Sequence, residues 1–261
     1  KKLDYLSLKM KILKNINTYF SIYHSNLILL SSFTAQKDLK NLSKVGFNKS
    51  AVLRPTFTVQ KKTKSLNFLI NKYNIMSKYF FLPNQFWVHK NHIQILRAIN
   101  TIKIKYKKDI QIVSTGILHD YRYPDHRKMI LKFIKEKNLS KNFVLLGIVP
   151  FDDLMSLIRH SMAVINPSKS EGWSSTVEQA KSFGKLILLS NIDVHKEQKP
   201  KRSFYFNPNM NNSLIKKLID TEKNFKKVKE EKIIHKTLMK QKKSFIKLSE
   251  NYSKIINSLT N

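Results

Sequence analysis

The sequence predicts an α/β protein built on a doubly wound, mostly parallel sheet. From Ser77 onward, apolar runs of strand length alternate with segments whose apolar residues recur at helical spacing. Gly116, Gly147 and Pro167 directly follow three of the apolar runs, where turns at the carboxyl ends of strands belong. Such alternation is typical of a parallel sheet covered by helices on both faces. We therefore expect a Rossmann-like domain over residues 77–210.

Six strands and four helices account for this region. The strands are expected at Lys78–Leu82, Ile110–Ser114, Phe143–Leu146, Ala163–Asn166, Leu186–Ser190 and Phe204–Phe206. The helices between them are expected at Asn91–Ile102, Asp125–Lys137, Phe151–His160 and Ser175–Phe183. Pro124 and Pro150 stand just ahead of two of the helix starts, where the fixed φ of proline suits a helix entry.

Residues 1–55 have the pattern of the tail of another α/β unit. A helix to about Tyr23, a strand at Leu27–Leu30, a capped helix at Ser32–Lys44 and a strand at Ala51–Leu53 are expected. This is too short for a complete nucleotide-binding domain, so we expect a partial second domain. The missing initiator Met favours a fragment. Residues 56–76 are expected to form a linker and residues 211–261 C-terminal helices.

Composition narrows the function classes. The chain of 261 residues carries a formal charge of +32 and is 41% hydrophobic, which is enough for an ordinary core. Most basic residues are Lys, whereas base readout favours Arg, so the charge reflects either an AT-rich coding sequence or anionic partners such as a membrane surface. The absence of Cys excludes disulfides, thiolate zinc sites and a Cys nucleophile, and it fits a reducing cytoplasm. No apolar run approaches the roughly 18 residues of a spanning helix.

The segment Met162–Gly184 carries the strongest chemical signal. An apolar run breaks at Pro167 into a polar loop and restarts as a helix. In parallel α/β sheets the ligand crevice lies off the carboxyl ends of the strands, where a helix N-terminus offers N–H groups and a positive dipole to an anion. Glu171 stands in the loop, and hydroxyl side chains open the helix at Ser174, Ser175 and Thr176. The segment therefore predicts a diphosphate site beside a sugar-like group.

Four blocks together resemble the retaining family-4 glycosyltransferases of the two-Rossmann-domain (GT-B) type. The blocks are FLPNQFWVHKNH at Phe81–His92, STG with DYRYP within Ser114–Pro124, NFVLLGIVP at Asn142–Pro150 and INPSKSEGWSSTVEQAKSFGK at Ile165–Lys185. Their order and spacing match the donor-binding domain of that family over roughly residues 78–198. The stretch SSFTAQKDL at Ser31–Leu39 is similar to the last βα step of the family's acceptor domain.

The resemblance implies roles for several side chains. Lys90 matches the basic residue that holds the donor pyrophosphate, although it could also be one Lys of many near a helix start. Where the family often has an Arg before this Lys, the sequence has Asn84 and Gln85. Glu171 matches the first carboxylate of a paired-Glu motif, which contacts the transferred sugar. The alternative is an exposed loop Glu.

The second carboxylate of the motif, which binds the ribose hydroxyls, is replaced by Gln179. A neutral hydrogen bond is about half as strong as a charge-assisted one, so donor affinity or identity can differ. Glu178 stands one position before the place of the motif's second carboxylate. It fits a capping box with Ser175 worth on the order of 1 kcal/mol.

For the remaining candidate residues, the sequence also fits a purely structural role. Gly147 and Ile148 fall where the family places its backbone against the nucleobase, but an ordinary tight turn fits as well. Trp173 can wall the sugar pocket or pack in the core. His89 and His92 lack further spaced ligands, and the resemblance implies no metal and no cofactor beyond the donor substrate. Asp193 and His195 are expected to belong to loop structure rather than to catalysis.

The resulting expectation is a retaining transferase, hexosyltransferase- or mannosyltransferase-like, that moves a sugar from a nucleoside diphosphate sugar to a hydroxyl. The family implies a lipid-linked or cell-surface glycan as acceptor, such as a lipopolysaccharide precursor. A cytoplasmic protein, peripheral at the membrane face, fits the charge, and the partial first domain predicts nucleotide binding with poor turnover. A noncatalytic nucleotide-sugar-binding domain and a basic nucleic-acid-binding protein are the rival hypotheses. No aromatic-basic stacking motif supports the latter, so no nucleic-acid partner is expected.

Overall fold

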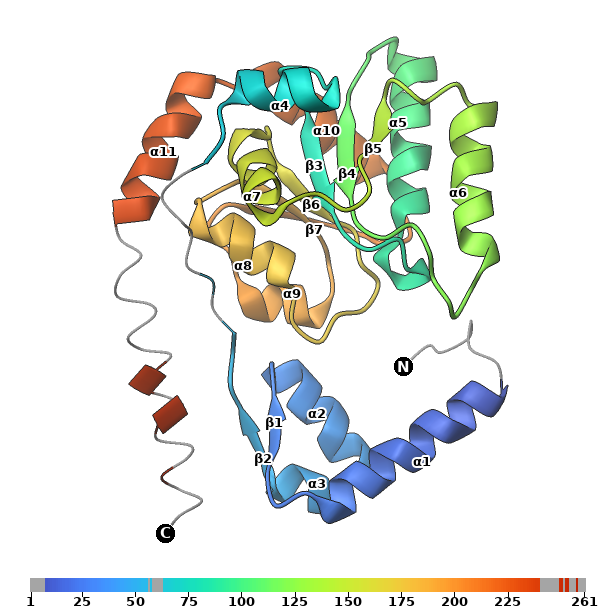
Figure 1. Cartoon of the computed structure of the whole chain (residues 1–261), viewed down its shortest axis with the longest axis vertical. Helices are drawn as coiled ribbons and strands as arrows, with labels where there is room; N and C mark the ends of the chain where they lie inside the picture. Colours follow the sequence, from blue (N-terminus) through green and yellow to red (C-terminus); the bar gives the residue numbers. More distant parts are fainter. Residues whose placement is uncertain are drawn as a thin grey trace.

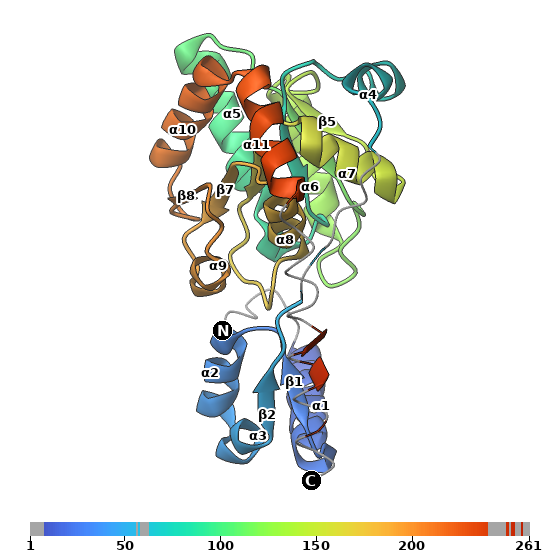
Figure 2. The same cartoon turned by 90° about the vertical axis from the view of Figure 1, so that its left-hand side faces the viewer.

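The computed structural model describes residues 8–55, 57, 63–239, 249–250, 252–253 and 257. Two parts are distinct in Figure 1. Residues 63–239 form the large domain, and residues 8–55 form the N-terminal unit beneath it. Figure 2 shows from the side that the N-terminal unit meets the large domain at the end that carries α8 and α9.

The large domain is built on a six-stranded sheet whose neighbouring strands are all parallel. The spatial order is β5-β4-β3-β6-β7-β8, so the direction of winding reverses between β3 and β6. These two strands are paired through Phe81 and Val164. The strands are β3 (Phe80–Pro83), β4 (Ile112–Thr115), β5 (Phe143–Leu145), β6 (Val164–Asn166), β7 (Ile187–Ser190) and β8 (Ser203–Phe206). The predicted doubly wound fold is therefore confirmed.

Helices cover both faces of this sheet. They are α4 (Leu66–Tyr73), the short 3-10 helix η1 (Val88–Lys90), α5 (His92–Tyr106), α6 (Asp125–Glu136), α7 (Phe151–His160), α8 (Ser175–Ser182), α9 (Asp193–Gln198), α10 (Asn212–Asn224) and α11 (Lys227–Met239). Helices α5, α6 and α10 lie over one face, and α4, α7, α8 and α11 contribute to the core on the other.

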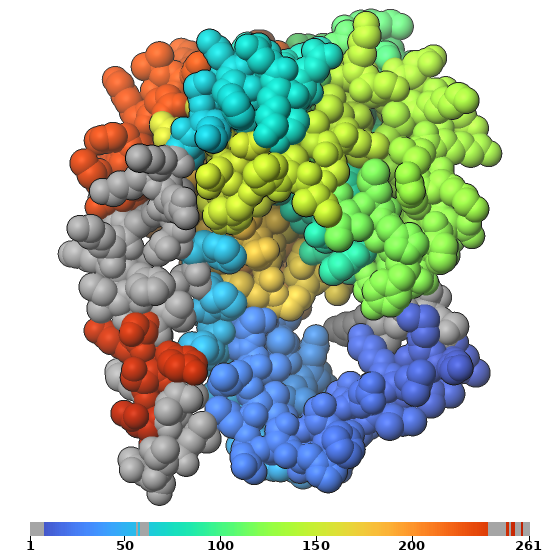
Figure 3. All heavy atoms as spheres, in the orientation of Figure 1, coloured from blue at the N-terminus to red at the C-terminus, as the bar shows by residue number. Residues whose placement is uncertain are grey.

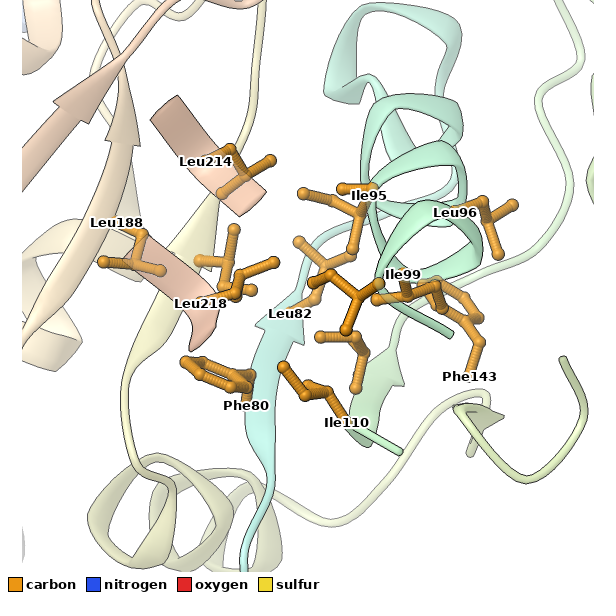
Figure 4. Close-up of a cluster of buried hydrophobic side chains, with 14 of the residues drawn as sticks. Phe80, Leu82, Ile95, Leu96, Ile99, Ile110, Phe143, Leu188, Leu214 and Leu218 are labelled. Carbon is orange, nitrogen blue, oxygen red and sulfur yellow. The ribbon is translucent and has the colours of Figure 1, made fainter. Parts of the chain in front are cut away.

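The two cores arise from strands that are apolar on both faces. Along β3, Phe80 and Leu82 enter the core under α5 and α10, whereas Phe81 between them enters the opposite core. Figure 4 shows the first of these clusters. All three side chains are fully buried. Burial of a side chain of this size contributes about 1.5–3 kcal/mol, and continuous apolar runs are what a sheet covered on both faces requires.

A buried ion cluster fastens α11 to the sheet. The Nζ of Lys185 lies 2.9 Å from Oε1 of Glu230 and donates to the Ser161 carbonyl at 2.6 Å. Arg202 donates to both oxygens of the same Glu230 carboxylate. Burial lowers the pKa of Lys185, and it would raise that of Glu230 if Arg202 and Lys185 did not hold it below its ordinary value. The buried charges are thereby paired rather than isolated.

The N-terminal unit has a simpler construction. It consists of α1 (Leu8–His24), β1 (Ile28–Leu30), α2 (Phe33–Leu42), α3 (Lys44–Asn48) and β2 (Ser50–Val52), with β1 and β2 paired in parallel. The helix expected over Ser32–Lys44 is in fact two helices. Ser43 is extended, with φ −155° and ψ 119°, and its hydroxyl accepts a bond from the Gly46 N–H to begin α3. A side chain that caps a new helix ends the preceding one.

Two further expectations need correction or fall outside the structure. The expected linker 56–76 contains α4, whose Leu66 and Leu69 belong to one of the cores. Linker positions 56 and 58–62 lie outside the described residues. The expected C-terminal helices are present as α10 and α11, whereas residues 240–248 lie outside the described part. Within the described residues, no helix has the length and apolar character needed to cross a bilayer.

Candidate functional site

A pocket of about 380 Å³ opens at the carboxyl ends of β3 and β4 and under the loops that follow β5 and β6. It lies at the reversal of strand order, which is where open α/β sheets bind ligands. The nine residues singled out from the sequence all line it: Gln85, Lys90, Gly147, Ile148, Glu171, Ser174, Ser175, Thr176 and Gln179.

Lys90 and Glu171 form an ion pair inside the pocket. The Nζ of Lys90 lies 2.6 Å from Oε1 of Glu171, and their side chains are only 13% and 7% exposed. Burial alone would raise the pKa of Glu171, but the charge and hydrogen bond of Lys90, with a bond from Ser168, hold it below its ordinary value. The carboxylate is therefore ionised at neutral pH. Glu171 is not an exposed loop residue, and Lys90 is not a solvated lysine.

Helix α8 begins differently from the predicted capping box. The N-cap is Ser174, whose hydroxyl accepts from the Val177 N–H at 3.4 Å. Glu178 instead accepts bonds from Lys181 and from the Gln198 amide. First-turn N–H groups have no acceptor within their own helix, so the start of α8 directs N–H groups and a positive dipole into the pocket.

A network of amides and hydroxyls fixes the pocket floor. Asn166 at the end of β6 donates to the Ser174 hydroxyl at 2.7 Å, and it accepts from Asn84 after β3 at 3.4 Å. The hydroxyl of Thr176 donates to the Pro83 carbonyl at 3.1 Å. The ends of β3 and β6 are thus tied to the first turn of α8, so that the N-terminal end of the helix has a defined position.

Two glycines form the opposite edge of the pocket. The N–H of Gly116 donates to the Gly147 carbonyl at 2.8 Å, which joins the loops after β4 and β5. A Cβ on Gly116 would lie 2.6 Å from the Asn84 carbonyl oxygen, and its φ is +127°, so only glycine fits. Next to this bond, Ile148 is 77% exposed and offers an apolar surface to a flat ligand group.

Trp173 and Gln179 complete the wall beside Glu171. Trp173 lines the pocket and donates its indole N–H to the Pro55 carbonyl at 3.2 Å, so it reaches from the pocket to the N-terminal unit rather than into the core. Gln179 is buried on α8 and faces the same pocket.

The histidines have structural surroundings in the described part of the chain. Within the described residues, no group of three His, Asp or Glu side chains is arranged to hold a metal ion. His92 is fully buried and stacks on Phe86, and burial lowers its pKa to about 3. Asp193 and His195, expected in a loop, instead form the first turns of α9. His195 is buried, and its Nδ1 lies 2.9 Å from the Ser190 carbonyl.

Some lining residues were missed by the sequence reasoning. Thr115 is the last residue of β4 and Gly116 follows it, both within the STG block, so the end of a strand was an available position signal for both. Trp87 also lines the pocket and stacks under the Arg122 guanidinium, 4.7 Å from its ring centre. Leu154 reaches the pocket from α7, and no local pattern distinguishes it from the other apolar residues of that helix.

The arrangement suits a diphosphate attached to a polar, hydroxyl-bearing group. It combines one buried cation, one helix N-terminus and one ionised carboxylate in a single crevice. The model of the family of glycosyl transferases group 1 matches residues 67–244. The chain belongs to this family. Among curated proteins compared by sequence, none matches.

Solved structures share the fold of this glycosyl transferases group 1 chain. A glycosyltransferase from Rickettsia africae aligns with a TM-score of 0.70 and 18% identity, over 90% of this chain and 64% of its own. HepE of Anabaena in complex with UDP and glucose aligns with a TM-score of 0.75 and 12% identity, over 94% and 66%. Sucrose-phosphate synthase from Thermosynechococcus elongatus aligns with a TM-score of 0.64 and 14% identity, over 90% and 59%. The chain thus spans about two thirds of the length of these proteins.

Proposed function

We propose that this chain contains the donor-binding domain of a retaining family-4 glycosyltransferase, which moves a sugar from a nucleoside diphosphate sugar to a hydroxyl acceptor. The strongest support for this proposal is that Lys90, Glu171 and the N-terminus of α8 all line one pocket at the reversal of strand order. In this proposal Lys90 and α8 bind the diphosphate, and Glu171 orients the sugar.

The chemistry follows from these positions. The bond between the sugar C1 and the diphosphate oxygen breaks, the acceptor oxygen bonds to C1 on the same face, and the hydroxyl proton passes to the departing phosphate oxygen. Negative charge grows on the diphosphate as the bond breaks. Lys90 and the first-turn N–H groups of α8 stabilise that charge in a partly buried site, where such contacts are stronger than in water.

A uridine donor and a surface-glycan acceptor are the finer proposals. HepE of Anabaena was solved with UDP-glucose, and this chain shares its fold. Ile148, exposed beside the bond between Gly116 and Gly147, offers an apolar surface on which a base can lie.

The proposal is tested by comparing UDP with uridine in calorimetric titrations. The Lys90→Met variant is expected to weaken UDP binding about tenfold to a hundredfold, because a charge-assisted contact contributes about 1.5–3 kcal/mol, and to leave uridine binding unchanged. Lys135→Met, which removes an exposed lysine on α6, is the matched control. Equal losses for UDP and uridine would show that Lys90 does not contact the diphosphate. A wild-type protein that binds neither UDP, GDP, ADP nor TDP would contradict the proposal.

A noncatalytic nucleotide-sugar-binding domain is the second candidate, because Gln179 stands in the pocket where the resemblance implies a carboxylate. The two candidates differ in turnover and not in binding. Measured in a protein that includes the acceptor-binding partner domain, Glu171→Gln is expected to abolish transfer while nucleotide binding persists. If Gln179→Glu creates transfer that the wild type lacks, the noncatalytic candidate is correct.

We further propose a peripheral contact between α1 and an anionic membrane. Leu8, Ile12, Ile16 and Phe20 recur every four residues, so they share one face of the helix, and each is at least 50% exposed. Lys9 lies on this face and Lys11 lies beside it, and the described helix carries no acidic residue. An apolar stripe flanked by lysines suits the lipid interface, where each lysine contributes about 1 kcal/mol toward anionic lipid.

Flotation with vesicles tests the membrane contact. The Ile12→Asn/Ile16→Asn variant is expected to lose binding to vesicles that contain phosphatidylserine, and wild type to bind phosphatidylcholine alone far less. Ile104→Asn on α5 is the control, since its side chain is 59% exposed on another helix. Equal binding by both variants would exclude α1 as the contact.

A further inference from the structure

A carboxylate of the large domain, that of Glu197, contacts the N-terminal unit. Glu197 on α9 accepts bonds from the backbone N–H groups of Phe33 and Thr34, each at 2.8 Å, and from the Thr34 hydroxyl at 2.7 Å. These donors form the first turn of α2, whose next N–H, at Ala35, is satisfied by Ser32. A residue of the large domain therefore completes the capping of a helix in the other part. Figure 3 shows the N-terminal unit in contact with the gold-coloured α8–α9 region.

Arg54 adds charge to this contact. Its Nη2 and Nε donate to Oε1 of Glu197 at 2.7 and 3.2 Å. The Glu197 side chain is 12% exposed. Burial would raise its pKa, but the N–H groups of α2, the Thr34 hydroxyl and Arg54 together hold the pKa below the ordinary value. Glu197 is thus ionised at neutral pH, and each of its bonds across the boundary is charge-assisted.

The contact continues into the pocket. The Arg54 guanidinium lies 4.7 Å from the ring centre of Phe33 and 5.6 Å from that of Trp173. Trp173 in turn donates its indole N–H to the carbonyl of Pro55, the neighbour of Arg54. Trp173 is a wall of the candidate donor pocket, next to Glu171. One continuous set of contacts therefore runs from the first turn of α2 to the donor pocket.

We propose that Glu197, Arg54 and Trp173 form an interdomain clasp, which positions Trp173 at the donor pocket and couples nucleotide binding to the placement of the N-terminal unit. The identity of the ligand as a nucleotide rests on the proposed function, whereas the contacts among Glu197, Arg54 and Trp173 do not depend on it. The three are positioning residues. Because coupling between two equilibria is reciprocal, a clasp that favours donor binding is itself tightened by the donor.

The first experiment measures the distance between the two parts without ligand. The sequence has no cysteine, so Lys37→Cys on α2 and Lys135→Cys on α6 give two spin labels and no background. In Glu197→Gln the new amide N–H₂ faces groups that donate hydrogen bonds. We expect electron double resonance to show a broader distance distribution for Glu197→Gln than for the protein with the native Glu197. Glu136→Gln, which removes the same charge on α6, should retain the wild-type distribution. An unchanged distribution in Glu197→Gln would overturn the clasp.

The second experiment asks whether the clasp reaches the pocket. The chain has two tryptophans, so fluorotryptophan labelling gives two ¹⁹F resonances, which Trp87→Phe assigns. Glu197→Gln is expected to shift the Trp173 resonance and to leave that of Trp87 in place. The Arg54→Lys variant keeps the charge and loses the planar fork, so it should produce a smaller shift in the same direction. A Trp173 resonance that keeps its wild-type position in both variants would overturn the link to the pocket.

The third experiment measures coupling with UDP as the probe. Glu197→Gln is expected to weaken UDP binding by about tenfold, a factor within the usual range of coupling between two sites, while Glu136→Gln binds as wild type. UDP should also narrow the wild-type distance distribution. Equal UDP affinity in wild type and Glu197→Gln would overturn the coupling. If the wild type binds no UDP, the uridine donor fails, and the coupling to UDP with it, whereas the distance and ¹⁹F measurements still decide the clasp.

Discussion

The large domain and the N-terminal unit are held in place by different forces. In the large domain, helices bury both faces of a six-stranded sheet, and its central strands are fully buried. In the N-terminal unit, Ile22 is the one buried apolar side chain among residues 8–55, and the sheet has two strands. The large domain therefore carries its own folding free energy, whereas the N-terminal unit depends on point contacts such as those of Glu197.

Hydrogen exchange should show the largest difference between the two parts. Amides of β3, β4, β6 and β7 are expected to exchange only through global unfolding, and those of β1 and β2 through local opening. Protection factors should therefore differ by roughly a thousandfold or more. Mass-spectrometric exchange of the native protein measures this. Equal protection would mean that both parts unfold as one unit.

Truncation of one apolar side chain in each part should show the next largest difference, in the free energy of unfolding. Phe81→Ala is expected to lower the free energy of unfolding by about 3–5 kcal/mol, because it leaves a cavity between β3 and the helices that cover it. Leu29→Ala in β1, where the side chain is 45% exposed, should cost less than about 1 kcal/mol. Urea unfolding followed by far-ultraviolet circular dichroism compares them. Similar losses would show that β1 belongs to a real core.

Two glycines offer a matched test of smaller size. Gly184→Ala places a Cβ against the Thr237 hydroxyl at a φ of +67°, so we expect a loss of about 1–3 kcal/mol. Gly46→Ala lies within α3 and meets only side-chain atoms, at 3.1 Å from Ile22 and Leu39. Its gain in helix propensity, about 1 kcal/mol, offsets that crowding. Thermal unfolding of both variants checks the contrast, and a large loss at Gly46 would contradict it.

The smallest effect concerns pH. The folded-state pKa of Glu197 is below its ordinary 4.5, so its contribution is complete above that value and is lost as pH falls through the lowered folded pKa. The distribution of distances between the spin labels should be constant from pH 7 to 5 and should broaden only in more acidic solution. Glu197→Gln should remove this dependence. A transition near pH 6 would implicate a histidine instead.

The strands and the pocket follow from local sequence, because each strand is a continuous apolar run and each loop directly after a strand reaches the same edge of the sheet. Glu171, Ser174 and Gly147 stand in such loops or at a helix start, and all three line the pocket. The pairs that depend on distant residues were not predictable. Lys90 and Glu171 are separated by 81 positions, and Arg54 and Glu197 by 143.

Local competition explains the other differences. The hydroxyl of Ser43 ends one helix and starts another, and periodicity alone does not reveal which neighbour a hydroxyl will choose. Ser174 rather than Ser175 caps α8 because Asn166, from the preceding strand, orients the Ser174 hydroxyl. Helix α4 was overlooked in an expected linker because its eight residues contribute only Leu66 and Leu69 fully to a core.

The backbone bond between Gly116 and Gly147 has a consequence for protein engineering. That rim of the pocket presents main-chain atoms, and Gly116 accepts no side chain, so evolution or design cannot retune ligand preference there by substitution. Variation has to enter at lining positions that carry side chains, such as Ile148 next to this rim and Gln179 on α8 across the pocket. A mutational library confined to these two positions would vary an apolar and a polar side chain of the pocket while leaving the backbone rim intact.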